Sequence, residues 1–389
     1  MKRGIINLPL HGGHAPPYLV KRMIHLSSSI TKIIIEEKGS VEFFRRISDP
    51  LWFQAFGSVL GFDWHSSGLT TVVTGVLKQS IKYDTHGISL SGGKGKNSTK
   101  PKLEIPKLAE KNYNLSTNRI NELVYASKMA AKVDSAAIQD GFNLYHHFIL
   151  FDGLGNWTII QQGLNKYNRM ARRYHWISNE TLNYINEPHT GIIGDERVPI
   201  CLDMTSTKSE ENRKVCVDIL KDGKSIKNSI YKIMETNASH NLDKWIYRNE
   251  AFFNSNALTD NFTNIEKYEF PRRINWKIMD KLYDIQPTKY EEIISQDGVG
   301  QSTVRALSLI AEIIFGTKAS WSDPVKYTYA HGGKDGVPFP IARKTYDYSI
   351  KYLSEAIDGS EIEKKEKIES LKRLSSFSST LFNTKDYNN

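Results

Sequence analysis

Two short runs of β-favouring residues around a glycine-containing loop constrain the fold of this chain more than any other stretch. Tyr145–Phe151 and Trp157–Gln162 are rich in aromatic and β-branched side chains and alternate in character. The loop between them is Asp152-Gly153-Leu154-Gly155-Asn156. This pattern predicts a β-hairpin, so the chain is expected to contain an antiparallel sheet.

Polar side chains that could transfer protons or hold a cation surround this hairpin. A cationic, aromatic segment with Arg172 and Arg173 follows it. Carboxylates and imidazoles beside arginines indicate a site for an anionic, phosphate-bearing partner. Because His146 and His147 are neighbours on a strand, they should point to opposite faces and cannot both serve one pocket directly. The polar residues are Lys132, Asp134, Gln139, Asp140, His146, His147, Gln161 and Gln162.

One chemical interpretation of this stretch is a metal-dependent nuclease. Asp134 and Asp140 would hold Mg²⁺ or Mn²⁺, which prefer hard oxygen ligands. His146 or His147 would assist, and Lys132 would polarise a phosphate oxygen. The second strand offers glutamines where restriction-like nucleases usually show an acidic residue and a lysine. The structural alternative is that both aspartates are caps or turn residues and that the histidines pack in a half-buried strand.

The most specific motif lies in Lys289–Phe315, where two helical runs flank Gly298-Val299-Gly300. One helix is expected to end near Gln296 and the next to begin near Ser302. This pattern resembles the helix–hairpin–helix module, whose glycine turn presents backbone N–H groups to a DNA phosphate without base recognition. A purely structural helical hairpin is the alternative. Further expected DNA contacts are Arg272, Arg273, Gly298, Gly300 and Arg305.

A second enzymatic interpretation concerns Asp323. Helix–hairpin–helix DNA glycosylases carry a catalytic aspartate after the second helix of the motif, and Asp323 resembles it at a longer spacing. The lyase branch has a lysine in the helix after the turn, where this chain has Ser302. Asp323 is equally well explained as a cap before Pro324.

The balance of charge favours an anionic partner. The 389 residues carry a formal net charge of +9, with a pI near 9.2. Ser91–Lys96 is rich in glycine and lysine but does not form a P-loop, because Ile88 and Gly95 replace the required glycine and hydroxyl residue. We expect a flexible basic loop there, with Lys94 and Lys96 contacting DNA phosphates, or else a solvated linker.

The sequence excludes several classes of protein. Cys201 and Cys216 are the only cysteines, so a disulfide framework and a cysteine-ligated zinc site are both excluded. The first 17 residues lack the apolar core of a signal peptide, and no run approaches about 18 apolar residues. We therefore expect a soluble, cytoplasmic protein without a membrane partner.

Length and pattern predict several structural units. The expected fold is α/β, mainly helical with a small sheet, followed by an all-α helix–hairpin–helix domain. The expected divisions are a catalytic domain at 1–220, a helical connector at 221–268, a DNA-binding domain at 269–350, and a charged helix and tail at 351–389.

Several strings together resemble one protein family, the archaeal and bacterial domain of unknown function 763 (DUF763). They are LPLHGGHAPP, SDPLWFQAFGSVLGFDWHSSG, SGGKGK, KVDSAAIQDG, LYHH, QQGLN, ARRYHW, EPHTGI and HGGKDG. The resemblance implies an intracellular prokaryotic protein and supplies no reaction. Our leading hypothesis is a DNA-processing or repair enzyme, a metal-dependent nuclease that holds DNA mainly by its backbone. The alternatives are a base-excision enzyme acting through Asp323 and a non-catalytic DNA-binding or adaptor protein.

Overall fold

A computed structural model gives the structure of the protein. It describes residues 17–62, 68–167, 169–194, 197–221, 228, 270–271, 273–325 and 343–382. Arg272, the loops around His11 and His331, and nearly all of the expected connector lie outside the described residues.

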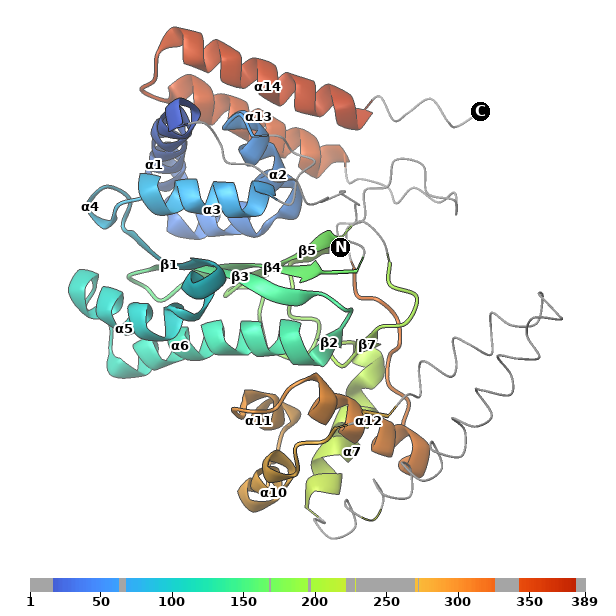
Figure 1. Cartoon of the computed structure of the whole chain (residues 1–389). Coiled ribbons are helices and arrows are strands. Elements are labelled where there is room, and N and C mark those ends of the chain that lie inside the picture. The colour runs from blue at the N-terminus through green and yellow to red at the C-terminus, as the bar shows by residue number, and fades with distance from the viewer. Residues whose placement is uncertain are drawn as a thin grey trace, which may run out of the picture.

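A five-stranded antiparallel sheet forms the centre of the molecule (Figure 1). Its strands, in spatial order, are β1 (Ile88–Lys94), β3 (Asn143–Asp152), β4 (Trp157–Asn165), β5 (Met170–Ile177) and β6 (Gly191–Ile193). The predicted hairpin is β3 and β4, with Ile149 opposite Ile159, so that prediction is confirmed. A separate two-stranded sheet pairs β2 (Ile138–Gln139) with β7 (Leu202–Asp203).

Both faces of the sheet are buried because the strands are apolar on both sides. Ile149 and Phe151 of β3 contribute to one hydrophobic core. Phe148 and Leu150, which alternate with them, contribute to a second core. Since successive side chains of a strand point to opposite faces, the sheet separates the two cores.

The glycine-rich stretch at 91–96 differs from its prediction. Residues up to Lys94 belong to β1, where Gly92 pairs with Phe148 of β3. Gly92 has a φ of +95°, and a Cβ there would clash with the carbonyl oxygen of His147. The glycine is therefore needed for close approach of two strands, and the expectation of a flexible loop is wrong for this part.

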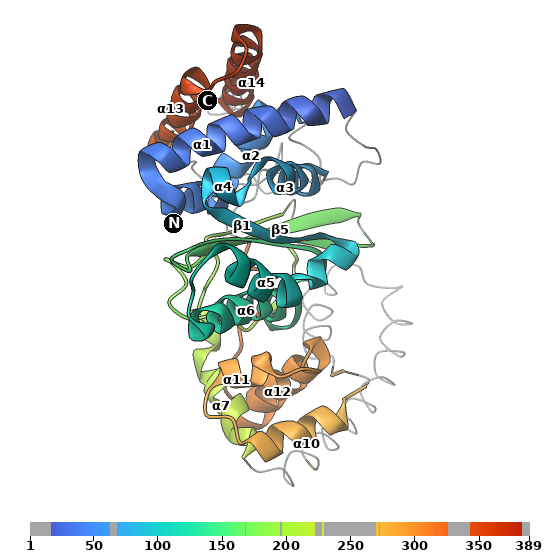
Figure 2. The same cartoon turned by 90° about the vertical axis from the view of Figure 1, so that its left-hand side faces the viewer.

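One face of the sheet is covered by the first and last helices of the chain (Figures 1 and 2). Asp49 caps α2 (Pro50–Val59) by accepting from the N–H groups of Leu51 and Trp52. Gly39, with a φ of +84°, interrupts α1 (Pro17–Ser48). The expected boundary at residue 350 falls inside α13 (Arg343–Gly359). The helices are α1 (Pro17–Ser48), α2 (Pro50–Val59), α3 (Gly68–Ser80), α13 (Arg343–Gly359) and α14 (Lys364–Phe382), with the short α4 (Tyr83–His86) beside them.

The other face carries helices that continue into a second helical layer (Figure 2). Ile159 of β4 and Leu307 of the last of these helices belong to one hydrophobic core, so packing is continuous from the sheet outward. The elements are η1 (Gly95–Thr99), α5 (Pro101–Asn112), α6 (Thr117–Lys132), the π-helical turn η2 (Val133–Ala137), η3 (Thr207–Ser209), α7 (Glu210–Leu220), α10 (Trp276–Ile285), α11 (Tyr290–Ser295) and α12 (Gln301–Phe315).

The described part of the chain is thus mainly helical with a small antiparallel sheet, as predicted. Among these helices, none has the length and apolar character needed to cross a membrane.

Candidate functional site

Residues 296–300 form a tight turn between α11 and α12, which we call the glycine turn. Gly298 has a φ of +92°, a conformation that favours glycine, and a Cβ there would clash with Ile278 of α10. Val299 is buried beneath the turn. The first helix ends at Ser295 and the second begins at Gln301, so the predicted ends of the two helices are confirmed within one residue.

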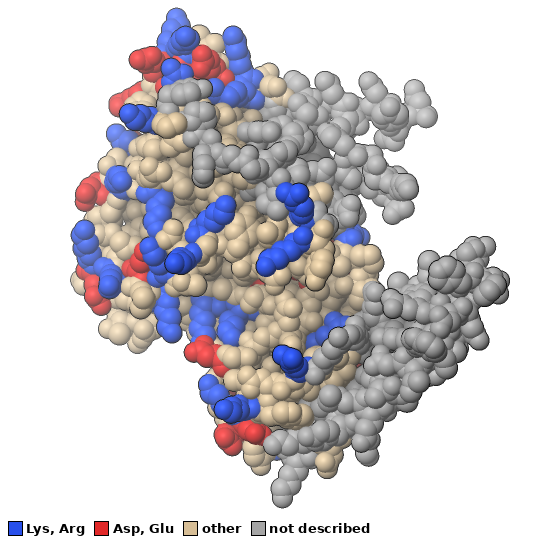
Figure 3. Space-filling view, in the orientation of Figure 1, with Lys and Arg blue, Asp and Glu red and all other residues tan. Residues whose placement is uncertain are grey.

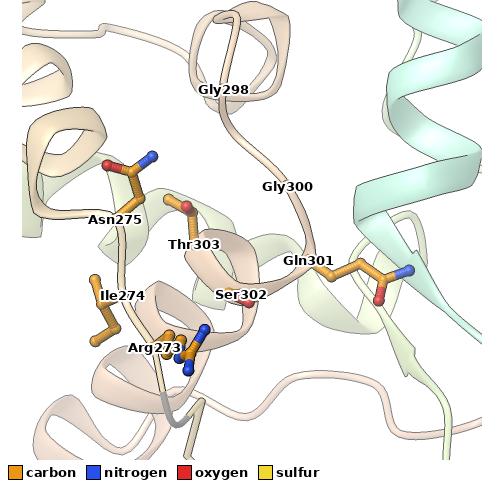
Figure 4. Close-up of a pocket in the computed structure, with 8 residues that line it drawn as sticks. All are labelled: Arg273, Ile274, Asn275, Gly298, Gly300, Gln301, Ser302 and Thr303. Carbon is orange, nitrogen blue, oxygen red and sulfur yellow. The ribbon is translucent and has the colours of Figure 1, made fainter.

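The glycine turn opens α12 without a side-chain cap. Gly300 is the N-cap residue and has no side chain to accept from the first N–H groups of the helix. A pocket of about 330 Å³ lies beside this helix start. Figure 4 shows Arg273 and Asn275, on the segment before α10, facing the first turn of α12. The lining residues are Arg273, Ile274, Asn275, Gly298, Gly300, Gln301, Ser302 and Thr303.

Lysines from three other helices lie near the glycine turn. Lys128 of α6 places its Nζ 3.2 Å from Oδ1 of Asp297, which is 75% exposed. This hydrogen bond lowers the pKa of Asp297, and the charges of Lys102 and Lys132 lower it further. The positive charge of Lys281, on α10, lowers the pKa of Lys132. The surroundings of the turn are therefore cationic despite the acidic residue within it.

Lys132, predicted as a catalytic residue, lies at this turn. Its Nζ donates to the carbonyl oxygens of Gln296 at 2.8 Å and Val299 at 2.9 Å. Burial lowers its pKa. Both of these contacts are to the backbone of the hairpin, about 165 residues away in sequence.

Asp134 is fully buried in a hydrogen-bonded network under the sheet. Its Oδ2 accepts from Nε2 of Gln161 and, at 3.1 Å, from Nε1 of Trp176. Its Oδ1 lies 2.5 Å from Nε2 of His189. Gln161 connects this network to His147, because the Oε1 of Gln161 lies 2.7 Å from the Nδ1 of His147. The carboxylate is thus surrounded by donors.

Asp140 belongs to a second buried network, centred on Arg172. Oδ2 of Asp140 accepts from Nη1 of Arg172 at 2.9 Å and from the hydroxyl of Tyr174 at 2.6 Å. Arg172 also donates two hydrogen bonds to Asp323, from Nη1 to Oδ1 at 2.9 Å and from Nη2 to Oδ2 at 2.7 Å. Asp323 accepts in addition from the backbone N–H groups of Val198 and Val325. All three charged side chains are nearly inaccessible to solvent.

A magnesium or manganese ion does not fit these two aspartates. Each carboxylate already accepts from several protein donors. At Asp140, Arg172 also supplies the positive charge that a metal ion would otherwise supply. Within the described ranges, no cluster of three or more His, Cys, Asp or Glu side chains is arranged to hold a metal ion.

Comparison with known sequences places these elements in one family. Residues 4–341 match the family described as "Protein of unknown function (DUF763)". The chain belongs to the DUF763 family. No curated protein and no solved structure matches it. The matched DUF763 region contains the sheet, both buried networks and the glycine turn, whereas α13 begins just beyond it.

The two histidines of the DUF763 sheet point to opposite faces, as predicted. Nε2 of His146 lies 3.1 Å from Oγ1 of Thr74 in α3. Nε2 of His147 lies 2.7 Å from Oγ of Ser127 in α6. Burial lowers the pKa of His146 to about 3 and also lowers that of His147. Both imidazoles are therefore neutral packing groups at pH 7.

The arginines predicted to bind DNA have different environments in the DUF763 chain. Arg172 and Arg173 are both 0% exposed, so a role at a DNA surface does not fit their placement. Arg173 donates to Gln54, Thr70 and His175. Arg305 is half-buried, with its guanidinium 5.0 Å from the Trp321 ring. Lys94, Lys96 and Arg273 are exposed.

Several residues of this DUF763 site were not predicted. His189 completes the Asp134 network, Lys128 pairs with Asp297 of the glycine turn, and the charge of Lys281 acts on Lys132. Their roles depend on contacts between segments far apart in sequence. His189 lies in the string EPHTGI, which was part of the family resemblance. Nothing in the residues around it indicates that it contacts Asp134.

Proposed function

We propose that this protein binds duplex DNA by its sugar–phosphate backbone, and that α11, the glycine turn and α12 form a helix–hairpin–helix module. The observation that carries the proposal is the uncapped start of α12 beside a pocket lined by Arg273. The first N–H groups of a helix lack intrahelical partners and carry partial positive charge. A phosphate group satisfies both the hydrogen bonds and the charge.

The surrounding lysines support the same ligand. Lys102, Lys128 and Lys281 reach the neighbourhood of the turn from α5, α6 and α10. Figure 3 shows Lys and Arg spread over the middle of one face, with Asp and Glu mostly towards its edges. Such contacts attach to phosphates of any sequence, so binding should be weakly sequence-dependent and strongly salt-dependent.

The geometry favours binding over the enzymatic hypotheses. Asp134, Asp140 and Asp323, the three candidate catalytic carboxylates, are buried and engaged by protein donors. A general acid, base or metal ligand must reach the substrate or its metal. These side chains support the non-catalytic alternative, in which the polar strings maintain the fold.

Replacing Gly300 tests the proposal. A Cβ at Gly300 would have no atom within 4 Å, and its φ of −143° suits any residue, so Gly300→Leu should fold. The added side chain stands at the start of α12 and should exclude a phosphate from the pocket. We expect affinity for a 20-base-pair duplex, measured by fluorescence anisotropy, to fall by about tenfold or more, the loss of a charged hydrogen bond or two.

The matched control is Gly75→Leu in α3. A Cβ at Gly75 also meets no atom within 4 Å, and α3 lies on the opposite side of the sheet. This variant should bind DNA like the wild type. If Gly300→Leu keeps its circular dichroism spectrum and binds as tightly as Gly75→Leu, the glycine turn is not the DNA contact.

A further inference from the structure

Helix α6 and strand β2 are joined to the helical hairpin by a row of polar contacts. The contacts bring the sheet-bearing part of the molecule against the turn proposed to hold DNA. They are Tyr125 with Glu291, Lys128 with Asp297, Lys132 with Gln296 and Val299, and Gln139 with the carbonyl of Gln301.

Lys132 differs from the others because its ammonium binds two backbone carbonyls of the glycine turn. The accepting oxygens, of Gln296 and Val299, stand on either side of Gly298, 2.8 and 2.9 Å from Nζ. Hydrogen bonds from a charged donor are stronger than neutral ones. Because both acceptors belong to the main chain, these bonds fix the path of the backbone rather than one side-chain rotamer.

The direction of these carbonyls determines the direction of the donors. In a planar trans peptide, the N–H points opposite to the C=O. The carbonyl of Val299 points to Lys132, so the N–H of Gly300 points away from Lys132. Gly300 lines the pocket at the start of α12, and no described peptide bond is cis.

We propose that Lys132 is a positioning residue that holds the glycine turn in its phosphate-binding conformation. This inference rests on the proposed DNA binding by the same turn. The carbonyl of Gln296 also accepts from the N–H of Val299 at 3.2 Å, a bond that would survive loss of the ammonium. The carbonyl of Val299 would lose its cationic donor, and the two oxygens would converge with no cation between them. The turn would then reorient to hydrate them, and the N–H of Gly300 would turn with its peptide plane.

Lys132→Met separates positioning from simple charge. Methionine keeps an unbranched stem but removes the charge and all three donors. The matched control is Lys102→Met, which removes one exposed positive charge near the same turn. We expect Lys132→Met to bind a 20-base-pair duplex about tenfold more weakly. Lys102→Met should lose less affinity and only through its charge.

The salt dependence of binding distinguishes loss of turn positioning from loss of a phosphate contact. A lost phosphate contact lowers the slope of log K against log salt by up to about 0.9, and its effect disappears on extrapolation to 1 M salt. Lys102→Met should therefore converge with the wild type at high salt, whereas Lys132→Met should stay weaker. Convergence of Lys132→Met would overturn the positioning role.

Hydrogen exchange of the free protein tests Lys132 independently of DNA. In Lys132→Met, amides of residues 297–303 should exchange faster than in the wild type and in Lys102→Met. Unchanged exchange would overturn the proposal even if affinity falls. If the wild type binds no duplex, the proposed function fails, while exchange still decides whether Lys132 orders the turn.

Discussion

Replacing Arg172 with methionine should destabilise the protein by about 3–5 kcal/mol, because it leaves buried charge without its partner. Arg172 holds Asp140 and Asp323 at once, and all three side chains are nearly inaccessible. Burial alone would lower the pKa of Arg172, but the two carboxylates raise it overall. This loss is large beside the 5–15 kcal/mol that stabilises a typical domain. Urea unfolding followed by circular dichroism measures it.

A surface arginine provides the comparison. Arg45 pairs with Glu42 on α1 and is half exposed, so Arg45→Met should cost about 1 kcal/mol or less. Neutralising a carboxylate in the Arg172→Met background, with Asp323→Asn, should recover part of the lost stability. If Arg172→Met is as stable as Arg45→Met but binds DNA poorly, Arg172 belongs to the DNA interface and the buried network is misassigned.

Acid should destabilise the fold through buried histidines. Burial lowers the pKa of His146 from 6.5 to about 3, and it lowers the pKa of His147 and His175 as well. Between pH 6.5 and about pH 3, His146 binds more protons in the unfolded chain than in the folded protein, so stability falls as the pH falls. The contribution of His146 is fully present above pH 6.5 and decreases by about 1.4 kcal/mol per pH unit below it.

Comparing the pH dependence of stability in the wild type and in His146→Gln isolates this effect from other titrating groups. His146→Gln cannot take up the proton, so its free energy of unfolding should change less between pH 7 and pH 5. We expect the difference to be about 2 kcal/mol for this single imidazole. Urea unfolding curves at the two pH values measure it. Equal pH dependence in both proteins would mean that His146 is protonated in the folded state.

Local sequence signals predicted local structure well. The alternation in Tyr145–Phe151 gave the hairpin and the opposite directions of His146 and His147. The glycine turn also lies where the sequence places it, between two helices. These features depend on steric and hydrogen-bonding preferences within a few residues.

The roles of the charged residues could not be predicted in the same way. Lys132 precedes Asp134 in sequence, yet its ammonium contacts a turn about 165 residues later. Arg172 pairs with Asp323 across a similar separation. A catalytic cluster and a set of buried ion pairs use the same residue types, and only tertiary packing decides which donors each carboxylate accepts.

The long-range packing of the chain ends was likewise not visible in the sequence. Helices α13 and α14 share a hydrophobic core with α1 and α2. Their composition is polar enough to have suggested a charged helix and tail. Their apolar residues, such as Leu353 and Leu374, lie buried among residues from the start of the chain.

Hydrogen–deuterium exchange of the wild type with and without a 20-base-pair duplex tests DNA binding at the glycine turn most directly. Binding should slow exchange at residues 297–303, where the uncapped N–H groups of α12 would meet a phosphate. Added salt should reverse the protection. Protection confined to other surfaces, or none at a saturating duplex concentration, would contradict DNA binding by this turn.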